Sequence, residues 1–287
     1  MPSVRLAIGL TAAIVATAVG AIFAIDVARG QKMQEIQFDL GKNIVETARL
    51  SGVPKFEARD VDGFVSYSVA GIPKEVVARF IRLGYEIRWQ PVFAFTMYAD
   101  RHRNPDMPVQ TAVLQLDIRD MNDEAAQAFA VRTIAQFQKG KWKRYADPDW
   151  EVLLTGRSSY LNEAGEINSD SPGTPDPSYK LSRDDWLKVA DSLRLRWVGD
   201  GVVAKLSINN SPGVDGKPAY RMTLEFESLQ VKLQRDAENL SRDLKAGDAK
   251  GWNSTAKYEA SKKNRQEINK RLASNALKRG DSVVSAP

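Results

Sequence analysis

The segments Thr111–Arg119 (TAVLQLDIR) and Tyr220–Glu227 (YRMTLEFE) each alternate apolar with polar side chains. Strict alternation places the apolar side chains on one face, as in a strand that is buried on one side. The apolar positions of the two segments coincide at an offset of 108 residues: Leu114 with Met222, Leu116 with Leu224, and Ile118 with Phe226. At the same offset, Ile87 and Trp89 coincide with Leu195 and Trp197. The pattern favours an internal duplication, although any two alternating strands coincide at an even offset.

Signals for helices and turns surround these strands. Asn122 is placed to cap a helix that runs to about Gln138, and Ser182 is placed to cap a helix that runs to Val189. The residues Gly199–Asp200–Gly201 separate two apolar runs, which predicts a hairpin. Further expected elements are strands at Phe64–Ala70, Glu86–Trp89, Val92–Tyr98 and Trp150–Thr155, and a helix beginning at Pro73 and carrying Val76, Val77, Phe80 and Ile81.

We therefore predict an α+β fold made of two helix-plus-antiparallel-meander units, at residues 60–142 and 182–250. The intervening residues 143–181 include the linker Asn162–Ser178, which is rich in Pro, Gly, Asp and Ser and too polar to bury. The C-terminal part is charged, with helices expected at Leu229–Lys245 and Ser254–Arg279.

The N-terminus carries a long apolar run. Residues Leu6–Ile25 contain 20 amino acids without a charge, after the short tail 1–5. As a helix this run would be about 30 Å long, enough to cross a bilayer. It predicts a transmembrane anchor followed by a juxtamembrane helix within residues 26–52, in a single-pass protein of the bacterial inner membrane with its body in the periplasm. A cleaved signal peptide ending near Ala21 is the alternative, which would give a secreted periplasmic protein.

Composition excludes several functional classes. The chain of 287 residues has no cysteine and one histidine, so it has no disulfide framework, no thiolate zinc site and no cysteine nucleophile. Gly199–Ala204 matches a dinucleotide fingerprint, but the residues that follow have strand character instead of forming the helix that such a site requires. Ser254–Lys257 matches the S-x-x-K element of penicillin-binding enzymes without its partner motifs. We predict no catalytic, cofactor-binding or metal-binding residue, although a hydrolase built on carboxylates stays open.

The basic character of the chain is concentrated in the tail, residues 251–287. This segment has eight Lys or Arg residues and three Asp or Glu residues, and its excess of five positive charges equals that of the whole chain. A solvated helix is the simplest interpretation, and docking to an anionic lipid or an acidic protein is the next. Nucleic-acid binding is not predicted, because the basic residues are not interleaved with aromatic ones.

Two polar loops, Asp100–Gln110 and Asn209–Pro218, occupy equivalent places in the two predicted units, and we expect them to contact a partner. The residues concerned are Arg101, His102, Arg103, Asp106, Asn209, Asn210, Asp215 and Lys217. The expected function is non-catalytic binding of another protein. An immunity-type inhibitor that neutralises an antibacterial toxin is one version, and a bitopic scaffold subunit of a pilus, secretion or division machine is the other.

Overall fold

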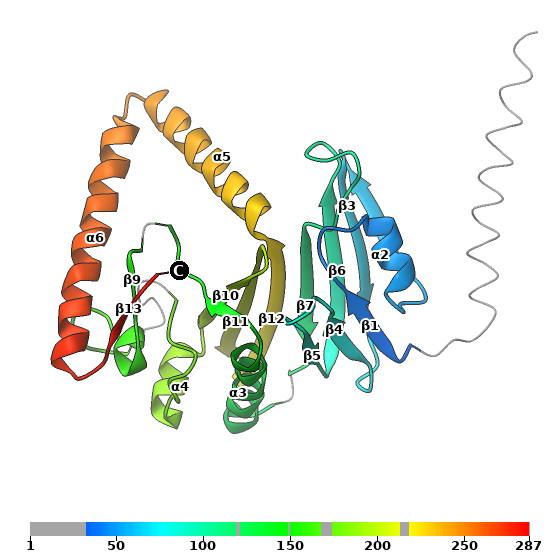
Figure 1. Cartoon of the computed structure of the whole chain (residues 1–287), viewed down its shortest axis with the longest axis horizontal. Coiled ribbons are helices and arrows are strands. Elements are labelled where there is room, and N and C mark those ends of the chain that lie inside the picture. The colour runs from blue at the N-terminus through cyan, green and yellow to red at the C-terminus, as the bar shows by residue number, and fades with distance from the viewer. Residues whose placement is uncertain (1–32, 119–120, 149, 168–173, 213–217, 287) are drawn as a thin grey trace, which may run out of the picture.

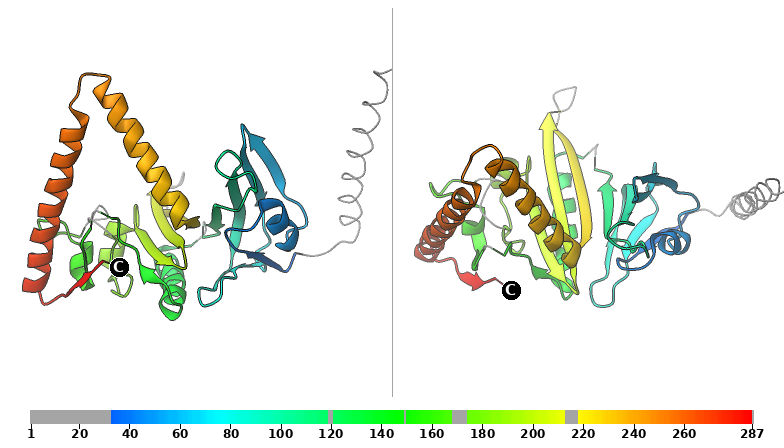
Figure 2. Two further views of the ribbon diagram at one scale, coloured as in Figure 1. Left: turned by 45° about the horizontal axis from the view of Figure 1, so that its top comes forward. Right: turned by 90° about the horizontal axis from the view of Figure 1, so that it is seen from above.

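The computed structural model describes residues 33–118, 121–148, 150–167, 174–212 and 218–286 (Figure 1). These residues form an α+β protein that contains three β-sheets and five α-helices. Two sheets and the shorter helices form the main body, and two long C-terminal helices meet at an apex away from it (Figure 2).

The largest sheet has eight strands, and every neighbouring pair is antiparallel. Its order is β2 (Glu57–Val61), β3 (Phe64–Ala70), β6 (Val92–Asp100), β7 (Thr111–Leu116), β12 (Pro218–Ser228), β11 (Val202–Pro212), β10 (Arg194–Gly199) and β8 (Lys143–Arg144). The strands β7 and β12 lie side by side at its centre, with Leu114 opposite Leu224. The predicted alternation is confirmed in both, because their apolar side chains are buried.

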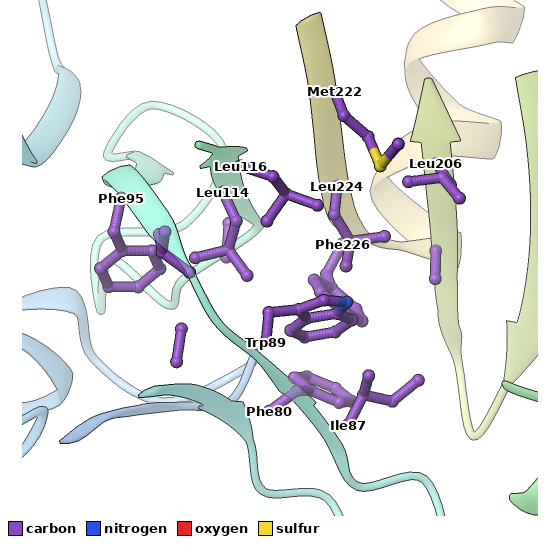
Figure 3. Packing of buried hydrophobic residues seen from close by; sticks show 14 of the residues in the cluster. Phe80, Ile87, Trp89, Phe95, Leu114, Leu116, Leu206, Met222, Leu224 and Phe226 are labelled. Carbon is purple, nitrogen blue, oxygen red and sulfur yellow. The ribbon is translucent and has the colours of Figure 1, made fainter. Parts of the chain in front are cut away.

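A second sheet packs against the first through aromatic side chains. It contains β1 (Glu35–Phe38), β4 (Val77–Phe80) and β5 (Ile87–Trp89), with β1 parallel to β4 and β4 antiparallel to β5. The ring of Phe226 on β12 lies 5.6 Å from that of Phe38, 4.4 Å from that of Phe80 and 5.5 Å from that of Trp89 (Figure 3). Burial of a large apolar side chain contributes about 1.5–3 kcal/mol, so this aromatic layer is a main source of stability.

The helices of the body begin where the sequence predicts. Asn122 caps α3 (Asp123–Lys139) by accepting a hydrogen bond from the Ala125 amide, and Ser182 caps α4 (Arg183–Val189). Phe137 on α3 stacks on Trp197 of β10, with 3.9 Å between the ring centroids. This contact fixes α3 against the large sheet.

Tyr220 joins β12 to both helices. Its hydroxyl donates a hydrogen bond of 2.7 Å to the Asp123 carboxylate and accepts one of 3.2 Å from the indole of Trp186. Burial is the main cause that raises the pKa of Tyr220 to about 12, so the hydroxyl stays protonated and keeps both bonds.

The hairpin predicted around Asp200 and Gly201 is confirmed. Gly199 pairs with Val202, and both turn residues have positive φ angles, 45° and 71°. This backbone suits a two-residue turn between twisted strands. Since β11 follows the turn directly, the interpretation of this motif as a hairpin instead of a dinucleotide site is also confirmed.

The two separate units predicted from the sequence are a point of correction. Their strands belong to one continuous sheet, in which β7 and β12 are hydrogen-bonded neighbours. The proposed correspondence of Ile87 with Leu195 is wrong, because β5 lies in the three-stranded sheet and β10 lies in the eight-stranded one. Similar alternation in these two strands reflects burial on one face in each case, which any half-buried strand shares.

The predicted membrane architecture is a second correction. Within the part of the chain that the structure describes, every helix is too short or too polar to span a bilayer. The predicted span Leu6–Ile25 lies outside the described residues. The described residues therefore contradict the prediction of a single-pass inner-membrane protein with its body in the periplasm.

Two predicted helices are also wrong. The juxtamembrane helix expected up to Leu50 is replaced by β1 and the short helix α2 (Ile44–Leu50), which Asn43 caps. Gly41, at φ 90°, lies between them in a conformation that favours glycine. The helix expected from Pro73 is instead β4, whose residues Ala78 and Phe80 face the core.

Candidate functional site

The most prominent feature outside the body is a pair of long helices, which we call the helical arm (residues 229–278). It consists of α5 (Leu229–Asp248), a short tip and α6 (Ser254–Lys278), and both predicted C-terminal helices are thereby confirmed. Ser228 caps α5, and Asn253 caps α6 by accepting a hydrogen bond from the Ala256 amide. The two helices diverge from the tip: α5 begins at the large sheet, and the C-terminal end of α6 lies on the far side of the body (Figures 1 and 2).

Ionic contacts fix the first turns of α5 to the body. Arg235 pairs with the buried Glu227 at 2.6 Å, and the ammonium of Lys232 lies 5.5 Å from the centre of the Tyr145 ring. Arg103 of the β6–β7 loop donates two hydrogen bonds to the carboxylate of Glu238, which lowers the pKa of that carboxyl group. The base of the arm is therefore held from both the sheet and the loop.

Close packing at the tip fixes the bend between the helices. A side chain at Gly247 would overlap the hydroxyl of Ser254 unless that hydroxyl rotated away, so the two helices approach closely at this position. The Asp248 carboxylate accepts a hydrogen bond of 2.8 Å from the Ser254 amide. Trp252 is 53% exposed, and the ammonium groups of two lysines lie 5.3 and 5.1 Å from its ring.

The far end of α6 packs on a small core of its own. Leu272 and Ala276 are buried against Leu154 of β9 (Val152–Leu154), which confirms the strand predicted there. The chain then ends in β13 (Val283–Ser285), which pairs with β9. Both ends of the arm are thus attached to the body, and the stretch between them is not.

An apolar stripe runs along α5. Its residues are Leu233, Ala237, Leu240 and Leu244, spaced by 4, 3 and 4 positions as in the seam of a coiled coil. Of the 20 residues of this helix, only Gly247 is fully buried; in the stripe, Leu233 (41%) and Ala237 are exposed, and Leu240 and Leu244 are half-buried. A helix with an apolar stripe normally buries that stripe. Here the stripe is only partly buried.

Acidic residues flank the stripe. At 100° per residue, Asp236 and Asp243 lie beside it on one side and Asp248 lies beside it on the other, while Arg235 and Arg242 lie on the opposite face. Asp236 pairs with Lys232 of the preceding turn, and Asp243 lies 3.9 Å from Arg242 with both side chains about three-quarters exposed. Acidic side chains therefore border the stripe on both sides, and Lys232 and Arg242 partly compensate the charges of Asp236 and Asp243.

Residues predicted in the first loop form contacts with other parts of the body. Arg101 pairs with Asp60 at 2.7 Å, and the His102 ring contacts the backbone oxygen of Asp62 at 2.8 Å. The backbone oxygen of Asp106 accepts a hydrogen bond from the Asn43 side chain. This β6–β7 loop thus contacts the β2–β3 hairpin and the residue that caps α2. Through Arg103 it also contacts the arm.

The second predicted loop does not join the first. Asn209 and Asn210 lie within β11, opposite Arg221 and Tyr220, and not in a loop. Asp215 and Lys217 lie outside the described residues. The register of β7 with β12 places the β6–β7 loop beside the end of β12, whereas the β11–β12 connection precedes its start. The predicted sites thus belong to opposite ends of the sheet.

The sequence interpretation missed the stripe on α5, because it treated this segment only as a charged helix. The 4-3-4 spacing of Leu233, Ala237, Leu240 and Leu244 was the available signal. The described residues contain no cluster of three or more His, Asp or Glu side chains that could hold a metal ion. Burial raises the pKa of the Glu227 carboxyl group, which pairs with Arg235 of the arm.

Comparison with protein-family models, with curated proteins and with solved structures gave no match to this chain. The arm, its apolar stripe and its acidic borders are therefore the observations that bear most directly on function.

Proposed function

We propose that this protein binds another protein, and that the stripe on α5 takes an amphipathic helix whose flanking residues are basic. The observation that supports the proposal is a 20-residue helix with one buried residue and a regular apolar stripe. Helix-in-groove and helix-on-helix contacts use apolar residues at this spacing as anchors. In this proposal the role is binding and not catalysis.

The charges on α5 define the chemistry of the partner. In a pair of α5 helices from two copies of the chain, Asp236 and Asp243 would border the shared seam and repel their counterparts. A partner with Lys or Arg at those positions would instead form ion pairs across the seam. Rim charges of this kind contribute more to specificity and association rate than to affinity.

Both versions of the expected function are compatible with this contact. An inhibitor that neutralises a toxin would use the stripe to hold one protein, and a scaffold subunit would use it to hold components of a larger assembly. The rigid attachment of both ends of the arm supports either version, because it presents α5 in one orientation and lowers the entropy lost on binding.

The proposal is tested with two designed peptides of about three heptads that share leucines at the seam positions. One peptide carries Lys at the flanking positions and the other carries Glu. We expect the Lys peptide to bind the full chain at least about tenfold more tightly than the Glu peptide, as measured by fluorescence anisotropy.

Variants place the contact on the stripe. Replacing Leu240 and Leu244 together by Ser removes the centre of the stripe, and we expect the Lys peptide to bind at least about tenfold more weakly. Ala246→Ser on the opposite face of α5 is the control and should bind as the wild type does. Equal affinity for both peptides, or unchanged binding by the double Leu variant, would contradict the proposal.

A further inference from the structure

A cluster of cationic side chains lies away from the arm, where the β4–β5 turn meets the C-terminal end of α3. These side chains line an open cleft of about 570 Å³. Its lining contains four cationic side chains and one carboxylate, and consists of Arg79, Gly84, Glu86, Arg88, Gln136, Lys139, Gly140 and Lys141. Volumes of about 300–1,000 Å³ are typical of sites for small molecules.

Two of the lining arginines occupy directly opposite positions on neighbouring strands. Arg79 on β4 pairs in register with Arg88 on β5. Like charges in directly opposite positions destabilise a sheet. Among the described residues Arg79 forms no ion pair, and its buried Nε has no hydrogen-bond acceptor. Arg88 has a single distant partner, since the carboxylate of Glu35 lies 3.6 Å from it. Glu35 thus compensates Arg88 in part, whereas Arg79 has no carboxylate partner among the described residues.

The backbone around the cleft is firmly held. The side-chain amide of Gln136 donates to the Arg88 carbonyl oxygen at 2.7 Å and accepts from the Arg88 amide at 2.9 Å, as a neighbouring strand would. The Lys141 amide donates to the Gly84 oxygen at 3.0 Å. The backbone that carries the lining side chains is thus held in one conformation, which lowers the entropy lost when a ligand binds.

Gly84 and Glu86 shape the cleft further. Gly84 has a φ of 81°, and a side chain there would lie 3.1 Å from two carbons of the Lys141 side chain. Glycine thus lets Lys141 lie across the turn. The single lining carboxylate, that of Glu86, accepts a hydrogen bond of 2.8 Å from the Gly84 amide. It is therefore engaged with the backbone instead of pairing with either arginine.

The position of one of the four cationic residues has a structural explanation. Lys139 occupies the last turn of α3, where a positive charge interacts favourably with the helix dipole. This explanation does not apply to Arg79, Arg88 or Lys141. Guanidinium groups bind oxyanions through two parallel hydrogen bonds, and an ammonium group adds a point charge.

We propose that this cleft binds a small phosphate-bearing anion. Arg79 and Arg88 hold the phosphate oxygens, and Lys141 and Lys139 supply further positive charge at the rim. The bound anion compensates the repulsion between the two arginines, so the free protein carries a cost in stability that the ligand removes.

Inorganic triphosphate is the probe, titrated into the full chain by calorimetry and compared with sodium chloride at the same ionic strength. We expect saturable binding to the wild type and at least about tenfold weaker binding to Arg79→Gln and to Lys141→Gln. Lys263→Gln on α6 removes one exposed positive charge outside the cleft and should bind as the wild type does.

Thermal unfolding gives an independent readout. Without triphosphate, Arg79→Gln should unfold at the same or a higher temperature than the wild type, because the opposed charges are gone. A lower unfolding temperature together with retained triphosphate binding would show that Arg79 is a structural residue, and would overturn the proposal. Absence of saturable binding to the wild type, or equal losses in Lys141→Gln and Lys263→Gln, would overturn it as well. Lys141 is exposed, so its variant keeps the test decisive if Arg79→Gln fails to fold.

Discussion

The small core that attaches α6 to the body is centred on Leu272, which makes Leu272→Ala an informative change. Leu272 is 2% exposed and packs with Leu154 and Ala276 in a cluster that is separate from the main core. Truncation of a buried leucine to alanine costs about 2.7–5 kcal/mol in large cores. This cluster has three buried members and can relax around the lost atoms, so we expect a cost near the lower end, about 2–3 kcal/mol.

The cost should act locally, because the cluster holds only α6, β9 and β13. Amide hydrogen exchange measured by mass spectrometry should therefore become about 30- to 150-fold faster in the C-terminal half of α6 and in β13. Exchange in the central strands β7 and β12 should not change.

Leu277→Ala provides a matched control. It makes the same substitution in the same helix at a position that is 61% exposed, and should leave exchange close to that of the wild type. Faster exchange in β7 and β12, or equal effects of the two leucine variants, would refute the separation of the small core from the main one.

Three further predictions concern the base of the arm and the body. Because the hydrogen bonds from Arg103 lower the pKa of Glu238 below 4.5, their pairing stabilises the base of α5 above about that pH and is lost as the pH falls through the lowered value. Exchange in the first turns of α5, corrected for intrinsic rates, should rise on acidification in the wild type and not in Glu238→Gln. Gly199→Ala should lower the free energy of unfolding by about 1–3 kcal/mol in urea titrations, since the added carbon overlaps the ring of Tyr85; no change would contradict that packing. Tyr220→Phe should cost about 1–3 kcal/mol, because it leaves an indole donor and a carboxylate without their shared partner. Equal stability of that variant would show that water replaces the lost hydroxyl.

Regular alternation and capping residues made much of the body predictable. The strands β7 and β12 and the helices after Asn122 and Ser182 follow from short-range patterns in the sequence. The error at β4 has a clear physical origin. Apolar residues at Val76, Val77 and Phe80 fit a helical period as well as a short strand, and only pairing with β1 decides between them.

The end of the linker is a second place where a local sequence pattern did not predict the structure. Its composition predicts a solvated segment, yet Thr174 and Asp176 are buried in the structure. The Asp176 carboxylate accepts a hydrogen bond from the Gly156 amide, and the backbone oxygen of Thr174 accepts one from the side chain of Arg144. Backbone amides and a buried guanidinium supply partners that a local sequence pattern does not reveal.

The candidate site was less predictable than the fold. Each of Arg101 and Arg103 pairs with a carboxylate of the same chain, 41 and 135 residues away, and their contact with a partner stays a prediction. The stripe on α5 is visible in the sequence as leucines at regular spacing. The exposure of each side chain is a property of the folded chain alone: Leu233 is exposed, whereas Leu240 and Leu244 are half-buried.

The central claim is that Leu240 lies at the contact with a partner, and cross-linking in the native cells tests it most directly. A photoreactive amino acid is placed at position 240 on the stripe, or at position 242 on the opposite face as the control. We predict one or a few defined adducts from position 240, none of them formed from position 242, each mapping to a helix with basic residues beside its apolar positions. Identical adducts from both positions, or none from position 240, would contradict the proposed binding surface.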